Sequence, residues 1–269
     1  MNFTNKTFVI TGASSGIGKE LAIKLARLGA NLVLAARNKD ALIITAEACL
    51  KNGGKAIVIP TDVTVPLECE RLIKAAIAEY QQIDFLINNA GIGMWSKFEK
   101  VTDLSIFEKI MQVNYLGSVY CTHYALPYLK KSQGLLVAIS SLTGKFGVPT
   151  RTGYAASKHA MQGFFDSLRI ELRGTGVGVL VVSPGFVATD IRQRLLGKDG
   201  NIIPAKNQPQ KAMSTEVCVD LIIDAIAKRE RELIMTLIAR VGVWFKLLLP
   251  NIVDRFAALA VTSNNKSKN

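Results

Sequence analysis

Short apolar segments alternate with helix-periodic segments over most of this chain, and this alternation constrains the fold more than any other feature. Continuously apolar strands are typical of a parallel sheet that is buried on both faces by helices. We therefore predict an α/β fold with one doubly wound parallel sheet of about seven strands. The expected strands span Phe8–Thr11, Asn31–Ala36, Ala56–Ile59, Ile83–Ile87, Leu135–Ile139, Val177–Val182 and Glu232–Met235.

The segments between these strands have helical periodicity and recognisable ends. Asn38 is suited to cap the second helix. The expected helices span Lys19–Leu28, Asn38–Lys51, Pro66–Gln81, Asp103–Lys131, Tyr154–Leu172 and Thr215–Lys228. Lys198–Lys211 is polar, contains two prolines and is predicted to be a mobile loop. Residues 1–236 form one domain, 237–262 are an apolar and basic extension of it, and 263–269 are expected to be a disordered tail.

Composition and charge exclude several classes of protein. Apolar residues make up 49% of the chain and charged residues 20%, which is typical of a globular domain. The net charge is +12, but no nucleic-acid-binding module accompanies it, so an anionic cofactor or membrane surface fits better. The four scattered cysteines and two histidines indicate neither disulfides nor a metal site. The first residues show no secretory leader, so we expect a cytoplasmic protein.

A glycine-rich turn, Thr11-Gly-Ala-Ser-Ser-Gly-Ile-Gly18, joins the first expected strand to the first helix. In a doubly wound sheet this turn binds the pyrophosphate of a dinucleotide at a helix N-terminus. Gly12, Gly16 and Gly18 allow the turn to form and the backbone to approach phosphate. The position of the turn in the first strand–helix unit therefore predicts nucleotide binding.

The end of the second strand indicates which dinucleotide binds. An NAD site usually has an acidic residue there, which accepts a hydrogen bond from the ribose 2′-hydroxyl. This chain has Ala36 and Arg37 instead, and a cation suits the 2′-phosphate of NADP(H). Ser14 and Ser15 can supply hydroxyl groups to the same phosphate.

Tyr154 and Lys158 are one helical turn apart, so their side chains share a helix face. A lysine ammonium beside a phenol favours the phenolate and lowers the pKa of the tyrosine toward neutrality. The pair is therefore a candidate acid/base catalyst.

Together these motifs resemble those of the short-chain dehydrogenase/reductase family, and the resemblance runs from Phe8 to about Leu195. Thr11–Gly18 matches the cofactor loop of that family, Asn88-Asn-Ala-Gly91 its NNAG motif, and Tyr154 to Lys158 its YxxxK motif. Ser141 precedes Tyr154 by 13 residues (154 − 141), as the family's catalytic serine usually does, and is preferred to Ser140 on that spacing. Within the family, the chain most resembles the lipid, retinoid and hydroxysteroid dehydrogenases.

The resemblance implies roles for particular residues. The implied catalytic residues are Asn114, Ser141, Tyr154 and Lys158. The implied cofactor-binding residues are Gly12, Ser14, Ser15, Gly16, Ile17, Gly18, Arg37, Asp62, Val63, Asn89, Ala90, Gly91, Tyr154, Lys158, Pro184, Gly185, Val187 and Thr189. Tyr154 is the implied general acid/base, Ser141 polarises the carbonyl, and Lys158 lowers the pKa of Tyr154 and holds the nicotinamide ribose. Asn114 is implied to position a water that relays protons through Lys158, and no metal is required.

Apolar side chains near these motifs favour a lipophilic substrate over a sugar. They are Met94, Trp95, Phe146, Val148, Phe186, Ile191, Leu195 and Leu196. Arg192 and Arg194 face either solvent or an anionic substrate group. The segment from Leu237 to Val261 is apolar but is interrupted by cations and by Pro250, so a transmembrane span is not expected. It is an interfacial helix pair at a membrane surface, a lid over the substrate site, or a subunit interface.

We therefore expect an NADP(H)-dependent oxidoreductase that transfers hydride between nicotinamide and a lipophilic ketone or secondary alcohol. A homodimer or homotetramer is expected from the resemblance, as is peripheral contact with a membrane. The alternatives are a 3-keto lipid reductase, of the keto-sphinganine or 3-oxoacyl type, and a non-catalytic NADP(H)-binding redox sensor. The complete set of catalytic side chains disfavours the sensor.

Overall fold

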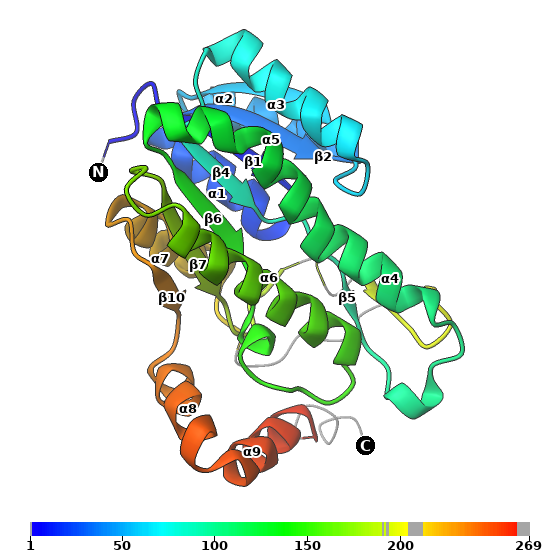
Figure 1. The fold of residues 1–269 in the computed structure, drawn as a ribbon. Helices are drawn as coiled ribbons and strands as arrows, with labels where there is room; N and C mark the ends of the chain where they lie inside the picture. The colour runs from blue at the N-terminus through cyan, green and yellow to red at the C-terminus, as the bar shows by residue number, and fades with distance from the viewer. Residues whose placement is uncertain (1, 190, 192–193, 204–211, 263–269) are drawn as a thin grey trace.

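The computed structural model describes residues 2–189, 191, 194–203 and 212–262, and its centre is a seven-stranded sheet (Figure 1). Every neighbouring pair of strands is parallel, in the order β10-β7-β6-β4-β1-β2-β3. The predicted doubly wound sheet is confirmed. The strands are β1 (Thr7–Thr11), β2 (Asn31–Ala36), β3 (Lys55–Pro60), β4 (Phe85–Asn88), β6 (Leu135–Ile139), β7 (Gly178–Ser183) and β10 (Glu232–Ile234).

Helices cover both faces of this sheet, and each face has its own hydrophobic core (Figure 1). Helices α1 (Gly16–Arg27), α2 (Lys39–Lys51) and α7 (Thr215–Ala227) pack on one face, and α3 (Pro66–Tyr80), α5 (Gly117–Ser132) and α6 (Thr152–Glu171) pack on the other. Successive residues of a strand point to opposite faces. In β1, Phe8 and Ile10 therefore enter the first core, and Val9 enters the second.

The ends of the helices show how local sequence sets them. The side chain of Asn38 accepts a hydrogen bond from the Ala41 amide at 3.0 Å, so its predicted capping role is confirmed. The predicted long helix from Asp103 is α4 (Ser105–Met111), a π-helical turn at Gln112–Leu116, and then α5. Such π turns are common at functional sites, and this one contains Asn114.

A second, small sheet was not predicted. It joins β5 (Gly93–Met94), β8 (Leu195–Leu196) and β9 (Ile202–Ile203). Strands of two residues are too short for a periodic pattern, so the sequence carries no signal for them. β9 occupies part of the predicted mobile loop 198–211. Residues 204–211 of that loop and the predicted tail 263–269 lie outside the described residues.

The chain continues from β10 into two consecutive helices, α8 (Leu237–Leu248) and α9 (Pro250–Thr262). Thr236 caps α8 by accepting a hydrogen bond from the Ala239 amide, and Pro250 begins α9. Figure 1 shows this pair, in orange and red, set apart from the main sheet. Across the described residues, no helix combines the length and apolarity that a membrane span needs.

Candidate active site

The candidate site lies where the strand order reverses. β1 neighbours both β2 and β4, so the loops that follow β1 and β4 diverge from one edge of the sheet. Ligands of doubly wound sheets bind at this switch point, beyond the carboxyl ends of the strands. The glycine-rich turn follows β1 and the Asn88–Gly91 motif follows β4, so the two motifs meet there.

The backbone of the glycine-rich turn is held against the loop after β4. Gly12 has a φ of +66°, and a side chain there would place its Cβ 2.9 Å from the Cα of Ala90. The Asn89 side-chain amide donates hydrogen bonds to the backbone oxygens of Thr11 at 2.9 Å and Gly12 at 3.1 Å. The Thr11 hydroxyl accepts from the amides of Asn89 and Ala90, both at 3.0 Å.

The N-terminus of α1 faces this turn. Ser15 is the N-cap residue, yet in the described structure its side chain accepts no hydrogen bond from the first turn of α1. Its hydroxyl instead accepts a hydrogen bond from the guanidinium of Arg194. The first amide groups of α1 therefore remain available, and with the helix dipole they favour an anion at this position.

Two adjoining cavities lie at the switch point, and together they extend from Arg37 to Tyr154. The cavity on the β2 side has a volume of about 360 Å³, and both cavities are lined by Gly12, Ser15, Ala90, Gly91 and Arg194. Ser14, Arg37, Asp62 and Val63 line the first. Gly16, Ile17, Asn89, Ser141, Tyr154, Lys158, Pro184, Gly185, Val187 and Thr189 line the second. A continuous channel past a helix N-terminus fits an extended dinucleotide.

One predicted cofactor residue has a different position. Gly18 lines neither cavity, and a Cβ there would lie 2.5 Å from the backbone oxygen of Gly12 and 2.5 Å from Nδ2 of Asn89. Its role in cofactor binding stays a prediction. Gly18 allows α1 to pack closely against the turn, which is the usual task of the third glycine in such loops.

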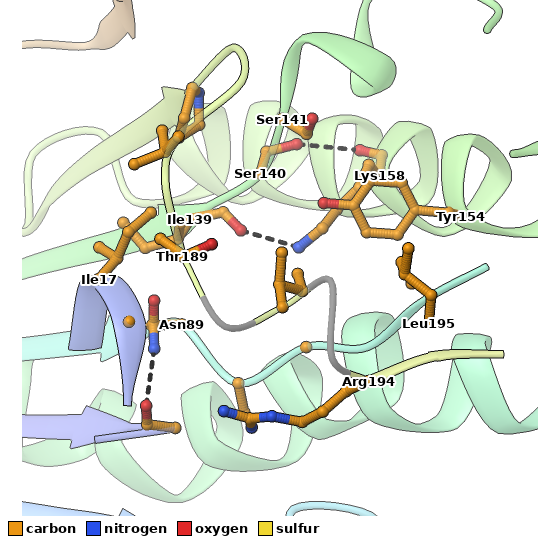
Figure 2. A pocket seen from close by; sticks show the side chains of 18 of the residues that line it. Ile17, Asn89, Ile139, Ser140, Ser141, Tyr154, Lys158, Thr189, Arg194 and Leu195 are labelled. Atoms are coloured by element: carbon orange, nitrogen blue, oxygen red, sulfur yellow. Dashed lines mark hydrogen bonds between the residues drawn. The ribbon is translucent and has the colours of Figure 1, made fainter. Parts of the chain in front are cut away.

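Tyr154, Lys158 and Ser141 meet at the catalytic end of the channel (Figure 2). Tyr154 and Lys158 project from α6, and Ser141 follows the end of β6. Burial raises the pKa of the Tyr154 phenol, and a hydrogen bond with Ser141 opposes that rise. Ser140 is buried and points instead to the backbone oxygen of Lys158, at 3.4 Å. The preference for Ser141 over Ser140, made on spacing, agrees with this geometry.

Burial shifts the pKa values of both Tyr154 and Lys158. Desolvation lowers the pKa of Lys158 to about 7. Its Nζ donates to the backbone oxygen of Ile139 at 2.8 Å and lies 5.8 Å from the Tyr154 ring centroid. Desolvation raises the pKa of Tyr154, against the positive charge of Arg151 and the Ser141 hydrogen bond. Lys158 and Tyr154 thus lie close together, and Arg151 adds a second cation near this phenol.

Asn114 is completely buried in the π turn before α5. Its side chain accepts from the Ile92 amide at 2.8 Å, and donates to the Ile92 oxygen at 3.0 Å and the Ser157 hydroxyl at 2.9 Å. A Cβ at Gly91 would lie 3.3 Å from Oδ1 of Asn114 and 3.7 Å from Nζ of Lys158. Gly91 thus keeps a passage between these two polar groups, which suits the predicted water.

The structure brings two arginines to the channel: Arg151, which had no assigned role, and Arg194, which was expected to face either solvent or an anionic substrate group. Arg194 contacts Ser15 beside the glycine-rich turn, and Figure 2 shows it across the cavity from Lys158. Arg151, three residues before Tyr154, lines the catalytic end. An arginine three residues before the tyrosine of the YxxxK motif is a signal that could have identified Arg151. Arg192 lies outside the described residues.

An apolar cavity of about 520 Å³ adjoins the catalytic end, and it is bounded by the inner side of α8 and α9. Its walls include the predicted substrate residues Phe146, Val148 and Phe186, and it reaches Ser141. Met94, Phe186, Ile191 and Leu195 line the neighbouring catalytic cavity. Leu196 belongs to a small core with Met94 and Tyr154. The volume is typical of sites for small organic ligands.

Comparison with known proteins decides the family. The sequence profile described as "short chain dehydrogenase" matches residues 6–199, which include the channel and its catalytic end. This chain belongs to the short-chain dehydrogenase family. It is therefore an oxidoreductase that acts on CH–OH groups with a nicotinamide cofactor.

Curated relatives cover almost the whole chain. It is 37% identical to a "Dehydrogenase/reductase SDR family protein 7-like" from Dictyostelium discoideum, over 97% of this chain and 84% of the relative. It is 36% identical to an "11-beta-hydroxysteroid dehydrogenase-like 4A" from Arabidopsis thaliana, over 92% of this chain and 82% of the relative. The mouse "Dehydrogenase/reductase SDR family member 7B" is also 36% identical, over 98% of this chain and 84% of the relative.

Solved structures share the fold. A short-chain dehydrogenase/reductase from Burkholderia phymatum in complex with NAD has a TM-score of 0.84 at 26% identity, over 94% of this chain and 96% of that one. An alcohol dehydrogenase from Thermococcus sibiricus complexed with 5-hydroxy-NADP has a TM-score of 0.74 at 26% identity, over 85% of this chain and 93% of that one. Because one holds NAD and the other an NADP derivative, these neighbours do not distinguish the two cofactors.

Proposed function

We propose that this protein is an NADP(H)-dependent oxidoreductase that interconverts a lipophilic ketone and its secondary alcohol. The observation that carries the proposal is the meeting of the dinucleotide channel with a large apolar cavity at Ser141, beside Tyr154. An apolar cavity with few polar groups at the reacting end selects a lipophilic molecule and fixes its orientation.

The preference for NADP(H) rests on the end of β2. Arg37 is exposed at the rim of the channel beside Ser14 and Ser15, and Ala36 precedes it. A guanidinium at this rim suits a phosphate on the ribose. No acidic side chain occupies the end of β2, where an NAD site usually has one.

The side chains at the catalytic end can perform the rest of the chemistry. The bound dinucleotide supplies or accepts the hydride at the carbonyl carbon. In reduction, the Tyr154 hydroxyl gives its proton to the carbonyl oxygen, which becomes the alcohol, and in oxidation the phenolate removes that proton. The Ser141 hydroxyl donates a hydrogen bond to the same oxygen as negative charge develops. Lys158, whose pKa lies at about 7, can return a proton to Tyr154.

The test is a substrate panel. NADPH oxidation is followed with steroids, retinals, keto-lipids and small water-soluble ketones, with Tyr154→Phe as the control. We expect turnover of lipophilic ketones and a loss of roughly 10²-fold or more in the variant, because general acid catalysis contributes about that much. Full activity of Tyr154→Phe would overturn the mechanism, and turnover of small polar ketones alone would overturn the lipophilic substrate.

The apolar cavity also favours the 3-keto lipid reductase within the same proposal, since a long acyl chain needs such a volume. A binding-only redox sensor has no need of Ser141 and Tyr154 hydrogen-bonded at the channel end. Assembly as a homodimer or homotetramer is included in the proposal on the family resemblance, and light scattering tests it.

We also propose that α8 and α9 approach a bilayer, so that the protein is cytoplasmic and peripheral at a membrane. Their inner side bounds the apolar cavity, while Leu248 at 80%, Leu237 at 76% and Trp244 at 72% exposure present apolar area elsewhere. The last 42 residues carry eight basic and three acidic side chains, a net of +5 (8 − 3), which favours an anionic surface.

Flotation with phosphatidylserine-containing liposomes tests this attachment. We expect the intact chain to float and a chain truncated after Met235 to remain in solution. Trp244→Glu is the milder variant, because Trp244 is exposed and does not line the cavity. Flotation of the truncated chain, or no flotation of the intact one, would exclude membrane attachment through α8 and α9 and leave the lid or the subunit interface as their role.

A further inference from the structure

Arg151 is the one charged side chain among the described residues that line the apolar cavity. It also lines the catalytic cavity, so it stands where the two join. Arg151 precedes α6 and is three residues from Tyr154, about one helical turn. Its positive charge reaches the Tyr154 phenol. A group bound by Arg151 would therefore lie close to the reacting carbonyl.

Neighbouring side chains hold the Arg151 guanidinium in place. It stacks over the Trp95 ring, 4.9 Å from the centroid, and over the Phe186 ring, 5.5 Å from the centroid. Thr150, the preceding residue, has a φ of +68°, which is rare and strained for a β-branched residue. The Thr150 oxygen accepts a hydrogen bond from the Ser96 amide at 3.0 Å, which holds this conformation.

This guanidinium lacks an anionic partner among the described residues. Its Nε is buried and has no hydrogen-bond acceptor there, and no described acidic side chain forms an ion pair with it. The other cations beside the cavity are satisfied: Lys145 pairs with Glu232 at 2.5 Å, and Lys246 donates to the Lys145 oxygen at 2.8 Å. A planar fork of N–H donors without an acceptor matches a carboxylate.

We propose that Arg151 binds the anionic group of the substrate, which makes the substrate an oxo-carboxylate amphiphile: an apolar chain or ring system with a carboxylate a short distance from the reacting carbonyl. The apolar part occupies the cavity bounded by α8 and α9, and the carbonyl lies at Tyr154 and Ser141. This inference rests on the proposed function and narrows its substrate class. Among 3-keto lipids it favours a free 3-oxo acid over keto-sphinganine, whose ammonium group Arg151 would repel.

Calorimetric titration of the intact chain with saturating NADP⁺ tests the inference by binding alone. The probes are 4-oxododecanoate and its methyl ester, which differ in charge but share the chain and the ketone. We expect the wild-type protein to bind the carboxylate roughly tenfold more tightly or better, since a hydrogen bond to a charged group contributes about that factor. Arg151→Gln should abolish this preference, and Arg151→Lys should retain part of it.

Arg173→Gln is the matched control, because Arg173 is exposed just beyond the other end of α6 and its loss changes the net charge equally. It should retain the full preference. Equal binding of acid and ester by the wild type, absence of binding by the acid, or a preference that survives in Arg151→Gln would each overturn the inference.

NADPH oxidation with the same two probes separates this inference from the proposed function. Reduction of the ester with exclusion of the acid would overturn the role of Arg151 and leave the reductase intact. Selective binding of the acid without reduction of any ketone in the panel would support the role of Arg151 and overturn the reductase.

Discussion

Asn89 donates a 3.1 Å hydrogen bond from its side-chain amide to the backbone oxygen of Gly12, and this bond ties the loop after β4 to the loop after β1. The same amide donates to Thr11 at 2.9 Å. Asn89 lines the channel, but its amide is committed to the backbone that shapes it. It thus acts on the cofactor site by positioning the glycine-rich turn.

Asn89→Asp should therefore weaken both folding and nucleotide binding. The carboxylate keeps the volume but cannot donate to the two backbone oxygens, which costs about 1–3 kcal/mol. Urea unfolding and the Kd for NADP⁺ measure the two effects. Asn251→Asp, at an exposed position in α9, is the control and should change neither. Equal effects of the two substitutions would contradict the positioning role.

Arg37→Ala should change cofactor choice without changing the fold. Loss of a guanidinium that contacts the 2′-phosphate should raise the Kd for NADP(H) by roughly 10-fold to 100-fold and leave that for NAD(H) nearly unchanged. Lys39→Ala removes an exposed cation two residues further on and serves as the control. Tighter binding of NAD⁺ than NADP⁺ by the wild-type protein would defeat the assignment.

Substitution of the adjacent residues Ser140 and Ser141 should have different effects on catalysis and stability. Ser141 is hydrogen-bonded to Tyr154, whereas Ser140 points to the Lys158 backbone. Ser141→Ala should lower kcat by about 10²-fold to 10³-fold, as loss of an oxyanion donor does. Ser140→Ala should lower stability more than kcat, because Ser140 is buried. A larger loss of kcat in Ser140→Ala would reverse the assignment of the doublet.

Lys158 should make the stability of the nucleotide-free protein depend on pH. Its pKa is about 7 when folded and 10.5 in its ordinary state. Between these values the unfolded chain binds a proton that the folded chain does not, so stability rises with pH and is lost as pH falls toward 7. Relative to Lys158→Met, the wild-type free energy of unfolding should rise by about 1.4 kcal/mol per pH unit.

Urea unfolding of both proteins between pH 7 and pH 10, without nucleotide, measures this difference. The other titrating groups are common to both proteins and cancel in the comparison. A difference that stays constant over this range would show that Lys158 remains charged in the folded protein.

Sequence reasoning predicted the elements whose signals are local. The continuous apolar strands, the Asn38 cap and the glycine-rich turn all depend on residues close together in the chain, so periodicity and turn chemistry identify them. The family motifs placed Ser141 and Tyr154 together for the same reason. The small sheet of β5, β8 and β9 was missed because two-residue strands carry no period.

The local arguments were incomplete where a property depends on what surrounds a side chain. The sequence did not show that a side chain at Gly18 would meet the backbone of Gly12. The spacing placed Lys158 beside Tyr154, but it did not show that burial lowers the pKa of Lys158 or that Arg151 adds a second positive charge nearby. Spacing along a helix determines which side chains share a face, while their charge depends on solvent and on neighbours from other elements.

By itself, the sequence determined the parallel sheet and the dinucleotide turn, because each depends on backbone propensity and short-range pattern, while the family resemblance supplied the catalytic motifs. Only the tertiary structure decided that α8 and α9 form one wall of an apolar cavity that reaches Ser141. It also decided that Arg151 stacks on Trp95 and Phe186 where this cavity joins the channel. These contacts join residues far apart in the chain. They exist only once folding has brought those residues together and excluded water from between them.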